Sequence, residues 1–194
     1  MCLICDNEYT KDTIEIVCCI DVDSIPDILV NLVTLYCDQS SITTIPDTLV
    51  NLVTLDCTWT SITSLPNTLV NLVTLDCRGT LITAIPDTLV KLNGLNCYGT
   101  LITKLPNTLI DLVTLNCGRT QITALPDTLV NLVKLICYDT QITTLPSTLK
   151  HIKYIYSYDK PFVILYKYEG SKHRNKSLVV NKNITKLTIY PDPI

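Results

Sequence analysis

The chain repeats a twenty-residue phrase along most of its 194 residues. The stretch LVNLVTLDCTWTSITSLPNT begins at Leu49, and LVNLVTLDCRGTLITAIPDT follows it directly. A fixed period of about 20 to 29 residues predicts a solenoid, in which each copy makes one turn and packs only against its neighbours. One proline marks each copy: Pro26, Pro46, Pro66, Pro86, Pro106, Pro126 and Pro146.

The spacing of apolar residues within the phrase predicts one short strand in each turn. The unit reads L-x-x-L-x-C-x-x-T-x-I-T-x-[LI]-P-x-T-L-x-x. Leu52, Leu55 and Cys57 must point inward, and the residues beside them alternate outward, as a strand requires. Strands of successive turns would then pair in parallel about 4.8 Å apart. Proline suits the first position of a helical turn, so PDTL and PNTL predict single turns on the other side.

These phrases resemble the leucine-rich repeat family, in its shortest class. ITSLP, ITAIP and ITALP are similar to phrases in the repeats of bacterial type III effector proteins, and similar short repeats occur in giant viruses. The resemblance covers about residues 12–160. It implies a curved right-handed coil with a parallel β-sheet on the concave face and little or no regular helix on the convex face. The chain departs from the family where cysteine replaces the third leucine and threonine or serine replaces the usual asparagine.

The repeat degenerates toward both ends, which predicts three parts. We expect residues 1–25 to form an N-terminal cap with a degenerate repeat and residues 26–150 to form six repeats. Residues 151–194 are expected to hold a degenerate repeat and a β-rich C-terminal cap, because their tyrosines alternate and NKNITKL is repeat-like. Such caps cover the core that the terminal turns of a solenoid would otherwise expose.

The cysteines indicate a reducing compartment and a buried column. MCLICDNEYT lacks the basic region and apolar core of a secretory signal, and no run of about 18 apolar residues predicts a membrane span. We therefore expect a cytoplasmic protein with reduced thiols, in the host cytosol if the chain is viral or a secreted effector. One inward cysteine per copy predicts an unreactive column. Its members are Cys37, Cys57, Cys77, Cys97, Cys117 and Cys137.

Four further cysteines gather near the N-terminus: Cys2, Cys5, Cys18 and Cys19. CLIC followed by CC resembles the first half of a RING zinc knuckle, but no His or further Cys pair follows at ligand spacing. Adjacent Cys18 and Cys19 on a strand would also point to opposite faces. We expect cap packing, with no metal and no cofactor. The alternative is a zinc site in these four cysteines, serving a zinc-dependent ubiquitin-ligase adaptor.

Threonines recur at two positions for which we expect hydrogen-bonding roles. The first column follows the inward isoleucine and should satisfy backbone groups where the chain leaves the strand. The second replaces the family's asparagines and should form a hydrogen-bonding ladder. The first column is Thr43, Thr63, Thr83, Thr103, Thr123 and Thr143. The second is Ser40, Thr60, Thr80, Thr100, Thr120 and Thr140.

Charge and motifs argue against several classes of function. Residues 1–149 carry 6 Lys/Arg and 15 Asp/Glu, a net of −9, which disfavours nucleic-acid binding by the repeats. Residues 150–194 carry a net of +6, and GSKHRNKS is expected to be a solvated loop. No nucleophile-elbow, zincin or P-loop phrase is present, so we expect no enzyme. Asp56 and Asp76 should stack as solvated carboxylates rather than as an acid–base pair.

The outward strand positions and the turn after each strand vary between copies, and this variation predicts a protein-binding face. Tyr, Trp and Arg are the residue types that anchor protein interfaces. An exposed Trp59 between two threonines is costly unless a partner covers it. The concave strand face is therefore expected to bind a protein of unknown identity. The candidate contacts are Tyr36, Asp38, Asp56, Trp59, Asp76, Arg78, Asn96, Tyr98, Asn116, Arg119, Tyr138, Asp139, Tyr156 and Tyr158.

Paired valines in the LVNLV phrase leave a second surface open to two interpretations. They are semi-buried filler between turns, or they form an exposed stripe for self-association or for a partner. The second interpretation makes the chain a self-associating structural repeat protein, and the sequence leaves its oligomeric state open. The pairs are Val50 and Val53, Val70 and Val73, and Val130 and Val133.

Overall fold

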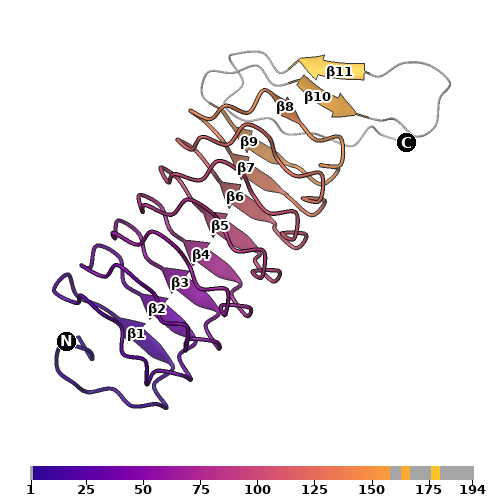
Figure 1. The fold of residues 1–194 in the computed structure, drawn as a ribbon. Helices are drawn as coiled ribbons and strands as arrows, with labels where there is room; N and C mark the ends of the chain where they lie inside the picture. The colour runs from indigo at the N-terminus through magenta and orange to yellow at the C-terminus, as the bar shows by residue number, and fades with distance from the viewer. Residues whose placement is uncertain (1, 158–162, 167–175, 180–194) are drawn as a thin grey trace.

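Each twenty-residue phrase makes one turn of a solenoid in the computed structural model (Figure 1). The structure describes residues 2–157 in full, and the backbone alone of residues 163–166 and 176–179. The main sheet has eight parallel strands in the order β1-β2-β3-β4-β5-β6-β7-β9. They are β1 (Glu15–Val17), β2 (Thr34–Tyr36), β3 (Thr54–Asp56), β4 (Thr74–Asp76), β5 (Gly94–Asn96), β6 (Thr114–Asn116), β7 (Lys134–Ile136) and β9 (Tyr154–Tyr156).

Equivalent residues of successive turns pair in register along this sheet. Leu55 pairs with Leu75, and Leu75 pairs with Leu95. The outward positions follow the same register, so Asp56 pairs with Asp76. Residues one period apart therefore lie beside each other, which confirms the predicted parallel sheet.

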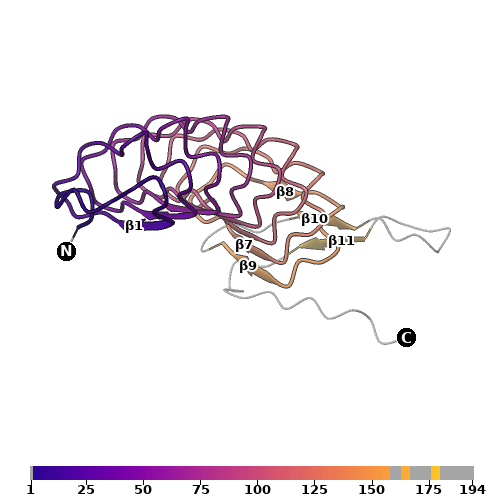
Figure 2. The same ribbon diagram turned by 90° about the horizontal axis from the view of Figure 1, so that it is seen from below.

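Tight turns, rather than helices, form the side opposite the main sheet (Figure 2). The Leu49 N–H donates to the Pro46 carbonyl at 3.3 Å, and the Leu69 N–H donates to the Pro66 carbonyl at 3.4 Å. Bonds over three residues are typical of a single turn. The described residues contain no helix, as the PDTL and PNTL phrases predicted. None of them forms a helix that could span a membrane.

The core is a continuous stack of inward apolar side chains between the sheet and the turns. In the third copy these are Leu49, Leu52, Leu55, Cys57, Ile62 and Leu65, none more than 7% exposed. Burying one Leu or Ile side chain contributes about 1.5–3 kcal/mol. Since one turn cannot enclose its own apolar residues, most of this burial comes from the neighbouring turns.

A smaller sheet at the C-terminal end has the order β11-β10-β8. Its strands are β8 (Thr144–Leu145), β10 (Val163–Tyr166) and β11 (Lys176–Val179). β10 pairs in parallel with β8 and antiparallel with β11. The sheet confirms the β-rich C-terminal cap. Tyr158 and residues 170–175 of the predicted basic loop lie outside the described residues.

Candidate functional site

Outward side chains of the main sheet form straight columns because the strands pair in register. The last residues of these eight strands are Val17, Tyr36, Asp56, Asp76, Asn96, Asn116, Ile136 and Tyr156. After each inward cysteine, two more residues form a stacked turn, which we call the turn edge. It comprises residues 38–39, 58–59, 78–79, 98–99, 118–119 and 138–139. The strand face and turn edge together carry every predicted contact residue except Tyr158, which is not described.

Asp and Asn at the strand ends have a structural role that the sequence analysis missed. Asp56 Oδ1 accepts a hydrogen bond from the Thr58 N–H at 3.0 Å. Asn116 Oδ1 accepts one from the Gly118 N–H at 3.2 Å. Asp76 and Asn96 make the equivalent bonds at 3.3 and 3.4 Å. Such Asx turns redirect the chain locally, so the recurrence of Asp and Asn here follows from the turn.

Asp76 is also held by neighbouring turns, so the expectation that it is simply solvated is wrong. Thr58 Oγ1 donates to Asp76 Oδ1 at 3.0 Å, and Asn96 Nδ2 donates to Asp76 Oδ2 at 3.0 Å. Arg78 forms an ion pair with the same carboxylate at 3.0 Å. The register brings these donors to one carboxylate and uses it to join three turns.

The second residue of the turn edge has a left-handed backbone in each copy from Gln39 to Asp139. Gly79 and Gly99 reach φ of 67° and 68° without steric cost, whereas Trp59 and Arg119 have φ of 54° and 53°. A non-glycine residue in this region costs about 1–2 kcal/mol. Bulky side chains that are kept in strained conformations are candidates for function.

Trp59 is the most exposed aromatic side chain whose surroundings are described, at 58%. Its ring lies directly on the backbone of Gly79, and a Cβ atom at Gly79 would overlap it. The glycine therefore creates a flat seat for the indole. The next turn holds one face of the ring, and more than half of the side chain stays available to a partner.

A second aromatic group lies farther along the turn edge. The rings of Tyr98 and Tyr138 have centroids 5.7 Å apart and are tilted by 49°. Gly118 lies between them, and a Cβ there would come within 3.2 Å of Tyr98 and 3.3 Å of Tyr138. The Arg119 guanidinium lies 5.7 Å from the Tyr98 centroid, and Arg119 Nε lies 3.4 Å from Asp139 Oδ2. We call Trp59, Tyr98, Arg119 and Tyr138 the aromatic edge.

A shallow hollow of about 290 Å³ lies at the middle of the strand face. Its floor includes Gly94, at a position where Thr74 and Thr114 stand in the adjacent strands. Asp76, Asn96 and Asn116 line one side of it. The missing side chain in β5 thus opens the hollow beside polar groups that can hydrogen-bond a ligand.

The predicted cysteine column is confirmed, and Cys18 extends it. Members from Cys37 to Cys137 are at most 1% exposed. Val17 pairs with Tyr36, and the Cys18 N–H donates to the Tyr36 carbonyl at 2.7 Å, just as the Cys37 N–H donates to the Asp56 carbonyl at 2.8 Å. Cys18 is therefore the equivalent of Cys37, and a spacing of 19 rather than 20 residues hides this in the sequence.

Burial keeps the column thiols protonated. It raises the pKa of Cys18 and of Cys97 to about 12. It also raises the pKa of Cys57 well above the usual range, with the carboxylates of Asp56 and Asp76 adding to the effect. Protonated thiols react poorly, so this column is structural.

The hydroxyl columns differ from the prediction. Thr60 Oγ1 donates to the Cys57 carbonyl of its own turn at 2.8 Å, and its equivalents do the same, so they cap each turn locally instead of linking turns. The column that begins at Thr43 is exposed, and its predicted role is wrong. A third column is half-buried, and its hydroxyl oxygens are buried without hydrogen-bond partners: Thr48, Thr68, Thr88, Thr108, Thr128 and Thr148.

Asparagines of the LVN phrase supply a ladder between turns. Asn51 Nδ2 donates to the Val30 carbonyl at 2.9 Å, Asn71 Nδ2 to the Val50 carbonyl at 2.9 Å, and Asn131 Nδ2 to the Ile110 carbonyl at 3.0 Å. The recurrence of Asn in the LVN phrase is the feature of the sequence that could have predicted this ladder. The amide of each of these asparagines reaches a backbone carbonyl of the previous turn.

The two valines of each LVNLV phrase have different environments. Val50, Val70 and Val130 are 41–42% exposed. Val53 and Val73 are half-buried between turns. The column of Val50 therefore fits the interpretation as an exposed stripe, and the column of Val53 fits the interpretation as filler between turns.

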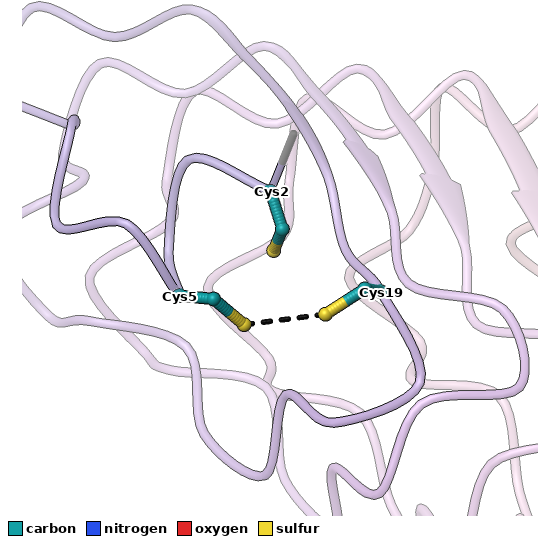
Figure 3. A group of neighbouring side chains, drawn as sticks. All are labelled: Cys2, Cys5 and Cys19. Carbon is teal, nitrogen blue, oxygen red and sulfur yellow. Dashed lines mark hydrogen bonds between the residues drawn. The ribbon is translucent and has the colours of Figure 1, made fainter.

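Cys2, Cys5 and Cys19 converge at the N-terminal end of the solenoid (Figure 3). All three Sγ atoms lie within 4.8 Å of one another, and those of Cys5 and Cys19 are 3.2 Å apart. Cys18 belongs to the column and is not part of this group. Burial raises the pKa of Cys2, but hydrogen bonds from Cys5 and Cys19 outweigh it and bring the value to about 7. The hydrogen bond with Cys19 raises the pKa of Cys5 to about 12.

Comparisons with known proteins show similarity in fold alone. No protein-family model matches the chain, and no curated protein sequence matches it. The InlJ functional domain from Listeria monocytogenes, which includes a cysteine ladder, is 20% identical with a TM-score of 0.63, over 76% of this chain and 39% of InlJ. YopM, a leucine-rich effector of Yersinia pestis, is 18% identical with a TM-score of 0.63, over 75% of this chain and 42% of YopM.

A plant peptide hormone receptor, RGFR1 in complex with RGF2, is 20% identical with a TM-score of 0.61. The match covers 76% of this chain and 28% of RGFR1, so the chain spans less than half of each of these solved proteins. These similarities and the twenty-residue solenoid show that the chain has the leucine-rich repeat fold. Its repeats belong to a short class of that fold.

Proposed function

We propose that the chain is a non-catalytic scaffold that binds a protein partner on the strand face and the aromatic edge. The observation that carries this proposal is Trp59, which is 58% exposed and has a strained left-handed backbone. Both features cost free energy in the unbound chain. Contact with a partner would recover the cost of the exposed ring.

Preorganised side chains support the same proposal. Gly79 seats the Trp59 ring, and Gly118 lets Tyr98 and Tyr138 approach each other. Arg119 lies over Tyr98 while Asp139 holds its guanidinium. Because these groups are already positioned, they lose little side-chain entropy when a partner binds. Aromatic and Arg side chains are also the types that dominate binding energy at interfaces.

The strand face suits a partner segment that carries polar side chains able to form hydrogen bonds. The hollow at Gly94 is large enough for one side chain and is bordered by Asp76, Asn96 and Asn116. Residues 1–149 carry a net charge of −9, which favours encounter with a basic surface. The proposal places the chain in a reducing compartment such as the cytoplasm, where its thiols stay reduced.

The test compares two exposed apolar residues at different places. Partners captured by the wild-type chain are identified and purified, and their affinities are measured for wild type, Trp59→Gly and Leu101→Ala. Leu101 is 48% exposed but lies outside the strand face and turn edge. Trp59→Gly removes the ring and relieves the backbone, so the fold is retained. We expect it to weaken binding by about 30-fold, equivalent to about 2 kcal/mol at a hot spot.

Leu101→Ala should leave the affinity unchanged. Equal affinities of wild type and Trp59→Gly for every purified partner would contradict the proposed binding face.

A second candidate function is self-association, which the exposed valine column favours. Val30, Val70 and Ile110 of this column are 38%, 42% and 50% exposed. Sedimentation of the wild-type chain and of Val70→Thr over a range of concentrations tests it. Dimers that weaken in the variant support self-association, whereas a monomer at all concentrations contradicts it.

A further inference from the structure

Two separate segments bring three thiols together at the N-terminal cap. Cys2 and Cys5 lie on one turn, which is closed by bonds from the Asp6 N–H to the Cys2 carbonyl at 3.0 Å and from the Glu8 N–H to the Leu3 carbonyl at 2.9 Å. Cys19 follows β1, and its carbonyl accepts from the Val22 N–H at 3.2 Å. Backbone hydrogen bonds therefore position both segments that carry the sulfurs.

The register of β1 makes the side chains of Cys18 and Cys19 point in opposite directions. Cys18 enters the column beside Cys37, so Cys19 must point to the other side. There its Sγ faces those of Cys2 and Cys5, as Figure 3 shows. Cys2 is buried, Cys19 is half-buried and Cys5 is exposed, so the group opens to solvent at Cys5.

We propose that Cys2, Cys5 and Cys19 bind one zinc ion through three thiolates, with a solvent molecule as the fourth ligand. Thiolate sulfur is a soft ligand that suits zinc, and the zinc–sulfur distance is about 2.3 Å. In a tetrahedral site this places the sulfurs about 3.8 Å apart. The three sulfurs already lie within 4.8 Å, so small side-chain rotations complete the site. Each thiol that is still protonated releases its proton to solvent as the ion binds.

The ion would fasten the cap to the first turn of the solenoid. Cys2 belongs to the apolar core, and Ile4 and Tyr9 pack against that core. Cys5 and Cys19 are separated by 14 residues, so a shared ion closes the intervening loop. This role is independent of partner binding at Trp59, and either proposal can fail without the other.

The experiment measures zinc in the full-length chain, reduced, loaded with zinc and then dialysed. The variants are Cys5→Ser and Cys19→Ser, with Cys18→Ser as the matched control because it changes the neighbouring thiol outside the group. We expect about one zinc per chain in wild type and Cys18→Ser, and at least about tenfold less in the other two. Zinc should raise the thermal midpoint of wild type and Cys18→Ser only.

Other outcomes overturn the proposal in distinct ways. Zinc retention by Cys5→Ser and Cys19→Ser equal to that of wild type would place the ion elsewhere. Loss of zinc in Cys18→Ser, with its circular dichroism unchanged, would show a four-thiolate site instead. A reduced wild-type chain that binds no zinc, and that loses two hydrogen masses on mild oxidation in a Cys5–Cys19 peptide, would show that the group is a disulfide pair.

Discussion

At the turn edge, the backbone conformation limits which residues fit as much as side-chain chemistry does. The left-handed position of the turn edge holds Gln39, Trp59, Gly79, Gly99, Arg119 or Asp139. Glycine suits this conformation, so each other residue there is retained at a cost. At Trp59 a proposed contact accounts for that cost. Gln39 is exposed, and its Nε2 makes one long hydrogen bond to Asp38 Oδ2 at 3.4 Å, which offsets little of that cost.

Replacing Gln39 by glycine should therefore stabilise the chain. Relief of the left-handed strain gains about 1–2 kcal/mol, and the greater freedom of the unfolded chain removes about 0.4–1 kcal/mol of it. We expect the free energy of unfolding to rise by about 0.5–1 kcal/mol, measured by urea denaturation. The reciprocal change Gly79→Gln should destabilise, because its Cβ overlaps the Trp59 ring. A loss of stability in Gln39→Gly would contradict this explanation.

Strands of only three residues act as elements because every one has neighbours in register. In β3 to β6 the inward Leu packs in the core, and the outward Asp or Asn closes the following Asx turn. β5 differs because Gly94 replaces the outward threonine. A Cβ at Gly94 would lie 3.4 Å from Thr114 Oγ1 and 3.9 Å from Thr74 Cγ2, which are ordinary contacts.

Gly94→Thr should stabilise β5 and fill the hollow in the strand face. Threonine favours strands, and the loss of glycine reduces the freedom of the unfolded chain, for an expected gain of about 0.5–1 kcal/mol. Thermal unfolding checks the gain, and the affinity for a captured partner checks the hollow. We expect Gly94→Thr to bind the captured partner more weakly than wild type and to unfold at a higher temperature. Lower stability would mean that β5 cannot accept the residue that its neighbours carry.

At the scale of the whole molecule, periodicity was sufficient to predict the solenoid, the parallel sheet and the buried column. It could not show that Cys18 joins the column, because the 19-residue spacing breaks the period. Nor could it show the local bonds of Thr60 and Asp56, since turn geometry is set by dihedral angles rather than by spacing. The meeting of Cys2, Cys5 and Cys19 depends on how the cap folds back, which no repeat encodes.

The buried thiols give the whole molecule a characteristic pH dependence. Burial raises their pKa values in the folded chain, so they stay protonated after the unfolded thiols ionise near pH 8.5. The stability that they contribute is present below about pH 8.5 and falls as pH rises. Each thiol should add about 1.4 kcal/mol per pH unit to this fall.

Urea denaturation between about pH 8 and 10.5 measures the slope of stability against pH. Cys97→Ala removes one of these thiols, so it should make the fall of stability with pH less steep by about 1.4 kcal/mol per pH unit. Identical slopes in wild type and Cys97→Ala would contradict this explanation, because they would show that Cys97 has the same pKa in the folded and the unfolded chain.

The most direct test of the stacked-turn structure is alkylation of the native, reduced and chelator-treated chain with a bulky maleimide, followed by peptide mass spectrometry. Equivalent turns bury Cys57, Cys77 and Cys97 completely, while Cys5 stays exposed. Cys5 is accessible, although its raised pKa slows its reaction. The structure predicts labelling of Cys5 in the native chain and no labelling of the three column thiols until the chain is denatured. Labelling of Cys57, Cys77 and Cys97 at the rate of the denatured chain would contradict it.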